Sequence, residues 1–319
     1  IYDLAYQYLI VIFAGIPATI LYNLLSGYLR SLGNSVIPVI FLIISAVLNI
    51  GLDLLFILVF HMGVFGAAFA TVLSQAISGV LCLIYIMKKI TLLHITRDDL
   101  QLSRQYVKNL IIMGFPMGFQ YSITAIGSVI LQTAVNSLGS TAVASMTAAS
   151  KISMFVVCPF DALGSTMATY SGQNVGAGEF DRVKKGLVSA SLLGSIYAVA
   201  IFVVLFFSCN YLIYMFVSPD ETEVIRQAHQ FLLYNAAFYV PLVFVNTVRF
   251  AIQGMGFSGF AMFAGVAEMI ARSLVGLALV PVFGFSAACF ASPLAWIFAD
   301  SFLIPAFIHC LNKLKRTIS

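Results

Sequence analysis

Charged residues are scarce in this sequence. Asp, Glu, Lys and Arg make up only 9% of the 319 residues, whereas a soluble globular protein carries about 25%. Hydrophobic residues make up 61%, and the mean hydropathy is +1.03. This composition excludes a water-soluble globule and predicts an all-α, polytopic membrane helical bundle. The apolar runs are long and continuous rather than alternating, which excludes a transmembrane β-barrel.

Residues suited to metal, redox or nucleophilic chemistry are also few. The five cysteines form no CxxC pair, and the four histidines are scattered along the chain. We therefore expect no metal site, no cofactor, no disulfide framework and no enzymatic activity. A membrane-embedded enzyme, which would need such residues clustered within the bilayer, is the alternative from a different functional class. The net charge of +4 is spread over connecting segments, so it predicts membrane topology rather than binding to nucleic acid.

Apolar segments long enough to cross a bilayer, about 20 residues each, recur along the chain. We expect nine spans, at residues 5–29, 36–60, 63–87, 107–136, 140–165, 186–216, 226–252, 258–281 and 286–311. Most Lys and Arg residues fall in the connections after spans one, three, five and seven and in the C-terminal tail. By the positive-inside rule, these connections and the C-terminus are cytoplasmic.

An internal repeat relates the first three spans to the last three. Asn23 and Gly33 correspond to Asn246 and Gly256 at a constant offset of 223, within two similar segments. We therefore expect a parent protein of twelve helices in two parallel, pseudo-symmetric lobes, with three helices preceding this chain. The expected domains are residues 1–88 (the second half of an N-terminal lobe), 89–106 (a cytoplasmic linker) and 107–319 (a C-terminal lobe of six helices).

One carboxylate lies inside an apolar span. Asp53 falls within the run from Val36 to Phe60, and an Asp at the centre of a spanning helix costs roughly 2.5 to 3.5 kcal/mol. Asn49 lies four residues earlier, so the two side chains share one helical face. We interpret the pair as part of a cation or proton site. The alternative is an Asp that a neighbouring helix holds for packing.

Several motifs resemble those of one transporter family. The segments RSLGNSVIP, NIGLDLLFI, GVFGAAFATVLSQ and GFPMGFQYSITAIGSVILQ resemble the multidrug and toxic compound extrusion (MATE) transporters, in particular their NorM and DinF-like bacterial branch. The resemblance covers the family's fourth to twelfth helices. It implies an antiporter of the bacterial plasma (inner) membrane that exports organic cations and drugs in exchange for Na⁺ or H⁺ by alternating access. We expect it to act as a monomer in the lipid bilayer.

The resemblance also implies a coupling site in the N-terminal lobe. Asn49 and Asp53 match the family's NxxxD pattern on its fifth helix, and Thr71 stands where a Thr is expected on the sixth. The family's first-helix Asp falls outside this chain. Some members bind the cation in the C-terminal lobe through a Glu and an Asp, but Thr124 and Leu242 occupy those positions here. The resemblance therefore favours the N-terminal lobe.

Other polar residues are candidates for the substrate cavity. Gln120, Tyr121 and Thr124 lie near a helix break that we expect around Pro116, where unwound backbone could line a cavity. Tyr170 to Gly186 is interpreted as a cytoplasmic hairpin.

Glu268 could pair with Arg272, four residues later on one helix face, or with Arg249. Either pair could lock helices together, or Glu268 could face substrate. A lipid or lipid-linked precursor flippase is the second alternative function. It would need a cavity rich in Arg and Lys, and the few candidates, Lys151, Arg249 and Arg272, argue against it.

Overall fold

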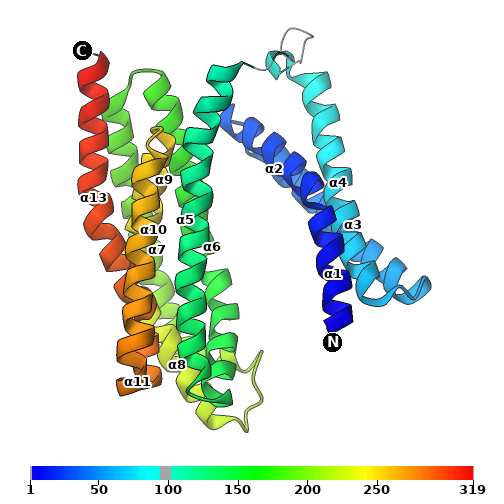
Figure 1. Cartoon of the computed structure of the whole chain (residues 1–319), viewed down its shortest axis with the longest axis vertical. Helices are drawn as coiled ribbons and strands as arrows, with labels where there is room; N and C mark the ends of the chain where they lie inside the picture. The colour runs from blue at the N-terminus through cyan, green and yellow to red at the C-terminus, as the bar shows by residue number, and fades with distance from the viewer. Residues whose placement is uncertain (1, 94–100, 102, 319) are drawn as a thin grey trace. The chain divides into compact units, whose positions relative to one another are not determined.

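The computed structural model describes residues 2–93, 101 and 103–318. Its regular secondary structure in this part of the chain is entirely helical (Figure 1), which confirms the predicted all-α membrane fold. The chain forms two compact units, Ile1–Leu102 (unit 1) and Ser103–Ser319 (unit 2). Each unit has its own core, so each is described by itself.

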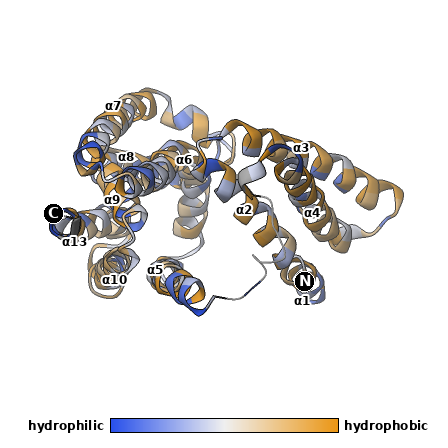
Figure 2. Cartoon of the chain, turned by 90° about the horizontal axis from the view of Figure 1, so that it is seen from above, coloured by the Kyte–Doolittle hydropathy of each residue, from blue (hydrophilic) through white to orange (hydrophobic). Residues whose placement is uncertain are grey.

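Unit 1 consists of helices that pack around α4. The elements are α1 (Tyr2–Ala14), α2 (Ile16–Ser31), α3 (Val36–Leu54), the π-helical turn η1 (Leu55–Val59), α4 (Gly63–Lys89) and the 3₁₀ turn η2 (Thr91–Leu93). Helices α1, α2 and α3 each contact α4. Leu25 and Leu29 of α2 meet Cys82 and Ile86 of α4 in a small core. Figure 2 shows that α3 and α4 are hydrophobic along most of their length, as expected for helices that also face lipid.

Unit 2 is a larger bundle with α9 inside it. The elements are α5 (Arg104–Asn136), α6 (Ser140–Gly176), α7 (Phe180–Ile213), α8 (Thr222–Ala237), α9 (Tyr239–Gly254), α10 (Ser258–Leu274), η4 (Val275–Leu279), α11 (Val280–Phe283), α12 (Phe285–Cys289) and α13 (Ala291–Ile318). Helix α9 packs against α6, α7, α10 and α13, while α5 packs against α10. Phe160, Leu205, Tyr239 and Ile252 are fully buried in this core.

Among the residues that the structure describes, seven helices are long and apolar enough to cross a membrane by themselves, and the number reaches nine if each of two bent pairs forms one span. The pairs are α1 with α2, bent by 44°, and α8 with α9, bent by 54°. The nine predicted segments are therefore all helical, but the first and seventh are not straight. Gly15 lies at the first bend, where an added Cβ would come within 2.2 Å of the Val72 side chain. The bend thus brings backbone close to α4.

One local prediction was wrong. Helix α5 continues through Pro116 without the expected break, as membrane helices can when local adjustments satisfy the freed backbone groups. The segment from Tyr170 to Gly186, predicted as a hairpin, consists of the end of α6 at Gly176, a turn, and the start of α7 at Phe180. The turn itself is short and contains Gly178, whose φ of +74° suits a residue without a Cβ.

The internal repeat is visible in the backbone. Gly33 and Gly256 have φ values of +83° and +90°, and Gly63 and Gly284 have +56° and +61°. A π-helical turn directly follows the second helix after each bend: η1 follows α3 in unit 1 and η4 follows α10 in unit 2. The two regions therefore share positive-φ glycines and π-helical turns at corresponding positions, in addition to their similar amino-acid sequences.

Candidate functional site

The first candidate site lies between α3 and α4 of unit 1. Asn49 and Asp53 are one turn apart on α3, and the Asn49 Nδ2 atom lies 3.5 Å from the Thr71 hydroxyl of α4, to which it donates. That hydroxyl donates in turn to the Ala67 carbonyl at 3.0 Å. The structure thus brings Asn49 and Thr71 together, and the direction of the bond leaves the Asn49 side-chain oxygen available to another partner.

Asp53 has an unsatisfied oxygen. It is the penultimate residue of α3, just before η1. Its Oδ1 atom is buried and has no hydrogen-bond partner in the described part of the chain. Leaving a buried carboxylate oxygen without a partner is costly. An oxygen in this position is a candidate ligand for a cation.

Thr19 and Gln75 extend this polar strip toward α2, which the sequence analysis did not anticipate. The Thr19 hydroxyl donates to the Gln75 side-chain oxygen. Gln75 lies four residues after Thr71, so both side chains share a face of α4. The sequence feature that could have identified Gln75 is its position within an apolar helix, four residues after the candidate ligand Thr71.

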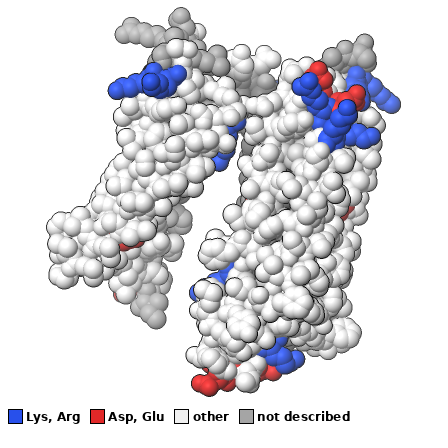
Figure 3. Space-filling model, turned by 180° about the vertical axis from the view of Figure 1, so that it is seen from behind, with Lys and Arg blue, Asp and Glu red and all other residues white. Residues whose placement is uncertain are grey.

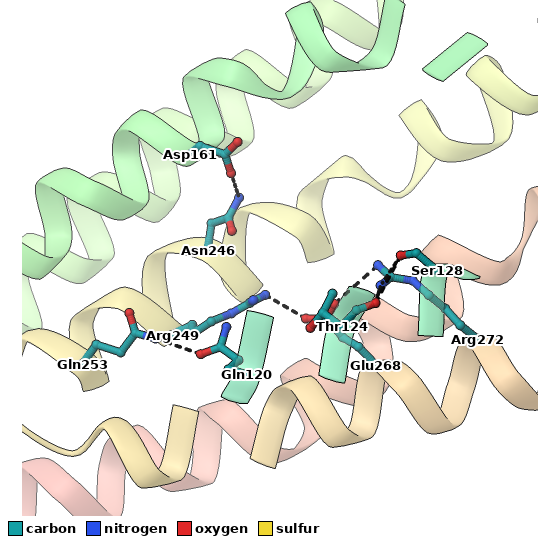
Figure 4. A network of polar contacts seen from close by, with 9 residues as sticks. All are labelled: Gln120, Thr124, Ser128, Asp161, Asn246, Arg249, Gln253, Glu268 and Arg272. Atoms are coloured by element: carbon teal, nitrogen blue, oxygen red, sulfur yellow. Dashed lines mark hydrogen bonds and ion pairs between the residues drawn. The ribbon is translucent and has the colours of Figure 1, made fainter. Parts of the chain in front are cut away.

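The second candidate site is a buried charged network in unit 2 (Figure 4), centred on Glu268 of α10. Its Oε1 atom lies 2.8 Å from Nη2 of Arg249 on α9, and its Oε2 atom lies 3.4 Å from Nη2 of Arg272. Glu268 is only 2% exposed. The sequence left open which arginine it pairs with, and the structure shows that it pairs with both.

The network continues onto α5. Nη1 of Arg272 donates to the Thr124 carbonyl at 3.4 Å and to the Ser128 hydroxyl at 3.5 Å. Beside it, Gln253 donates to the Gln120 side-chain oxygen at 2.8 Å. The arrangement joins α5, α9 and α10 through polar contacts in a membrane-spanning bundle.

Of the five residues predicted for the substrate cavity, Gln120, Thr124, Arg249 and Glu268 belong to this network. The exception is Tyr121, which is 59% exposed.

Two further acids lie near the arginines. Asp161 of α6 accepts a hydrogen bond from Asn246 at 3.2 Å and is close enough to interact electrostatically with Arg249. Asp300 of α13 interacts with both Arg249 and Glu268, and its buried Oδ1 atom has no hydrogen-bond partner among the described residues. Arg249 therefore interacts with three carboxyl groups, those of Asp161, Glu268 and Asp300. Sequence spacing could not identify the partners of Asp300, because they lie on other helices.

A cavity of about 330 Å³ adjoins the network within unit 2. Arg272 and Ser128 lie in its wall, together with the aromatic side chains of Tyr239 and Trp296. Polar side chains such as Gln132 and Asn235 line it as well, and its volume lies within the range of small-molecule sites. Within the described residues, no group of three or more His, Cys, Asp or Glu side chains is arranged to hold a metal ion.

Comparison with known proteins agrees with this architecture. The MatE family model matches residues 1–55 and 116–278. The chain is 33% identical over 246 residues to a probable multidrug resistance protein, YpnP, of Bacillus subtilis, covering 77% of this chain and 54% of the relative. It is 26% identical to a second such protein, YoeA, of the same organism, covering 73% and 52%. The chain thus spans about half the length of these curated relatives.

A solved structure shares the fold. A crystal structure of a MATE protein in complex with MaL6 superimposes with a TM-score of 0.90 at 20% identity, covering 97% of this chain and 70% of that one. The helical order, the buried polar sites and the family match lead to one assignment: this chain belongs to the MatE family.

Proposed function

We propose that the protein is a Na⁺- or H⁺-coupled antiporter that exports organic cations and drugs by alternating access. In this proposal residues 1–88 complete an N-terminal lobe, residues 89–106 form a cytoplasmic linker and residues 107–319 form the C-terminal lobe. The protein acts as a monomer in a bacterial plasma membrane, with its C-terminus in the cytoplasm. The observation that carries the proposal is the buried, unpartnered Oδ1 atom of Asp53.

Asp53, Asn49 and Thr71 are the proposed coupling residues. Carboxylate, amide and hydroxyl oxygens are the hard ligands that alkali and alkaline-earth cations accept. Because the Asn49 Nδ2 atom is directed at Thr71, its Oδ1 atom remains free to face a cation beside Asp53. A proton on Asp53 would neutralise the same charge. If drug and ion favour different conformations, each lowers the affinity for the other by the same factor.

The cavity of unit 2 is the proposed place for substrate contact. Tyr239 and Trp296 offer aromatic surface, which attracts organic cations. Arg272, in the same wall, is paired at 3.4 Å with Glu268, whose carboxylate it shares with Arg249. The pairing of both arginines also weighs against a flippase that would use them to bind a lipid pyrophosphate. The relatives' names, which refer to multidrug resistance, support the same substrate class.

Ethidium efflux from drug-sensitive cells tests the proposal. Cells expressing the wild-type protein should expel the dye, whereas cells expressing Asp53→Asn should not. Asp220→Asn, which changes an exposed loop acid, is the matched control and should export normally. Collapsing the sodium and proton gradients separately identifies the coupling ion. Export by Asp53→Asn at the wild-type rate would exclude Asp53 as the coupling group.

A further inference from the structure

A groove on the membrane-facing side of unit 2 lies between α7, α9 and α13. Its volume is about 370 Å³. The apolar side chains that form it include Val188 and Leu192 of α7, Phe244 and Val248 of α9, and Ile304 and Ile308 of α13. Val188 and Leu192 are each 62% exposed. The groove is therefore open on a side where the bilayer provides the solvent.

The few hydroxyl groups in and behind this groove are already satisfied. Ser191 and Thr247 share a hydrogen bond of 3.1 Å, and Ser195 donates to the Ser191 carbonyl at 2.7 Å. Thr247 also donates to the Val243 carbonyl at 2.8 Å. A polar ligand would find no free partner here, so the groove suits a hydrocarbon chain.

Basic residues border one end of the groove. Lys184 and Lys185 are exposed and lie one turn before Val188, on the face of α7 that forms the groove. On α13, Lys315 follows Ile308 by two turns and pairs with Asp181 at 2.7 Å. Neither Lys184 nor Lys185 forms an ion pair in the described structure, although both are within the field of Asp181.

Figure 3 shows basic side chains gathered at this end of unit 2, with acidic side chains between them.

The length of the groove matches one leaflet of a bilayer. From Lys185 to Ser195, at the far end of the α7 lining, is about 15 Å along a helix. Half of the hydrocarbon core is also about 15 Å. A lipid with its headgroup at the lysines would therefore have an acyl chain of suitable length along the groove.

We propose that the groove and the lysines at its end form a binding site for an anionic diacyl phospholipid. The phosphate lies at Lys184 and Lys185, and one acyl chain fills the groove between α7, α9 and α13. The anionic headgroup supplies the charge that these lysines lack, and the chain covers the apolar side chains. This inference does not depend on the transported substrate or on the coupling ion.

Native mass spectrometry of the full chain released from detergent measures this binding. The probes are dioleoyl phosphatidylglycerol, which is anionic, and dioleoyl phosphatidylcholine, which is not. We expect a tightly bound phosphatidylglycerol and no comparable phosphatidylcholine. Lys184→Gln with Lys185→Gln should weaken phosphatidylglycerol binding about 10- to 30-fold, since each basic residue near anionic lipid contributes roughly 1 kcal/mol. Lys88→Gln with Lys89→Gln, an exposed lysine pair ending α4, is the control and should bind normally.

A second pair of variants tests the groove itself. Ser195→Trp fills it and should reduce phosphatidylglycerol binding at least as much as the double lysine change. Leu193→Trp introduces the same side chain at a 60% exposed neighbour that does not line the groove, and it should have no effect. If Ser195→Trp does not fold, the lysine variants still decide the headgroup site.

Three outcomes would overturn the inference. Equal binding of the two lipids would exclude headgroup recognition. If both double lysine variants lost phosphatidylglycerol binding to the same extent, the lipid would be attracted by positive charge in general and not by this site. A dimer mass that Ser195→Trp abolishes would show that a second copy of the chain covers the groove.

Discussion

The two repeats, residues 2–89 in unit 1 and 222–318 in unit 2, share their special backbone conformations but differ in buried polar chemistry. The bends lie at Gly15 and Phe238, which are separated by the same offset of 223 that relates Asn23 to Asn246. At that offset Ser26 corresponds to Arg249. The buried polar residues have therefore diverged between the repeats, while the backbone course has been kept.

The contrast is sharpest around the acids. Ser45 and Asn49 of α3 correspond to Glu268 and Arg272 of α10. In unit 2 these positions form an ion pair, whereas in unit 1 they are uncharged and Asp53 remains without a partner at Oδ1. One repeat thus has charges that stabilise helix contacts. The other has a carboxylate available for a ligand.

Breaking the network in unit 2 should have the largest effect. Glu268→Ala leaves Arg249 and Arg272 buried without their carboxylate, and removing one partner of a buried ion pair costs about 3 to 5 kcal/mol. Thermal unfolding of the purified protein in detergent measures the loss. Glu223→Ala, which removes an exposed acid paired with Arg226, serves as the control. Equal melting temperatures for the two variants would show that the network does not stabilise unit 2.

The next largest difference in stability is expected between an alanine substitution at a glycine in a helix contact and one at a glycine outside such a contact. In α9, an added Cβ at Gly254 would lie 2.2 Å from the Ala168 carbonyl oxygen, and backbone cannot move aside as a side chain can. Gly254→Ala should therefore lower the free energy of unfolding by about 1 to 3 kcal/mol. Gly27→Ala in α2, where no atom lies within 4 Å, should raise it by about 0.5 to 1 kcal/mol. If the two substitutions changed the free energy of unfolding by similar amounts, the close helix contact at Gly254 would not contribute to stability.

Asp53→Asn should have a small effect on stability despite its large expected effect on transport. The substitution removes a desolvated charge without removing a hydrogen bond to Oδ1, so we expect a gain of up to about 1 kcal/mol. The same melting assay measures it, at a pH near 7 and without sodium. A loss as large as that of Glu268→Ala would mean that Asp53 is paired and structural.

Ser26→Ala should have the smallest effect. The Ser26 hydroxyl is buried without a partner in the described structure, so its removal costs no hydrogen bond. We expect a change within about 0.5 kcal/mol. A clear loss of stability would show that the Ser26 hydroxyl has a hydrogen-bond partner. Ser26 would then differ less from Arg249, its ion-paired counterpart in the second repeat.

The sequence alone determined the class of the protein and its local patterns. Lipid-facing and core positions are both apolar, so long hydrophobic runs locate the helices without knowledge of their neighbours. Residues four apart on a helix share a face, so Asn49 with Asp53 and Glu268 with Arg272 were already visible as pairs. The constant offset from Asn23 to Asn246 and from Gly33 to Gly256 identified the repeat, and the positive φ at both glycines favours that residue type.

Only the tertiary structure decided which helices exchange polar contacts. Gln120 and Gln253 are 133 residues apart, and the second arginine on Glu268 comes from another helix. Such contacts depend on how far each helix is rotated and displaced along its axis, which hydrophobic periodicity leaves undetermined in a bundle apolar on all sides. The same reason explains why the partners of Asp300 and Gln75 were not identified. The continuous course of α5 through Pro116 was not foreseen for another reason: the local adjustments that satisfy the freed backbone groups are not visible in the sequence.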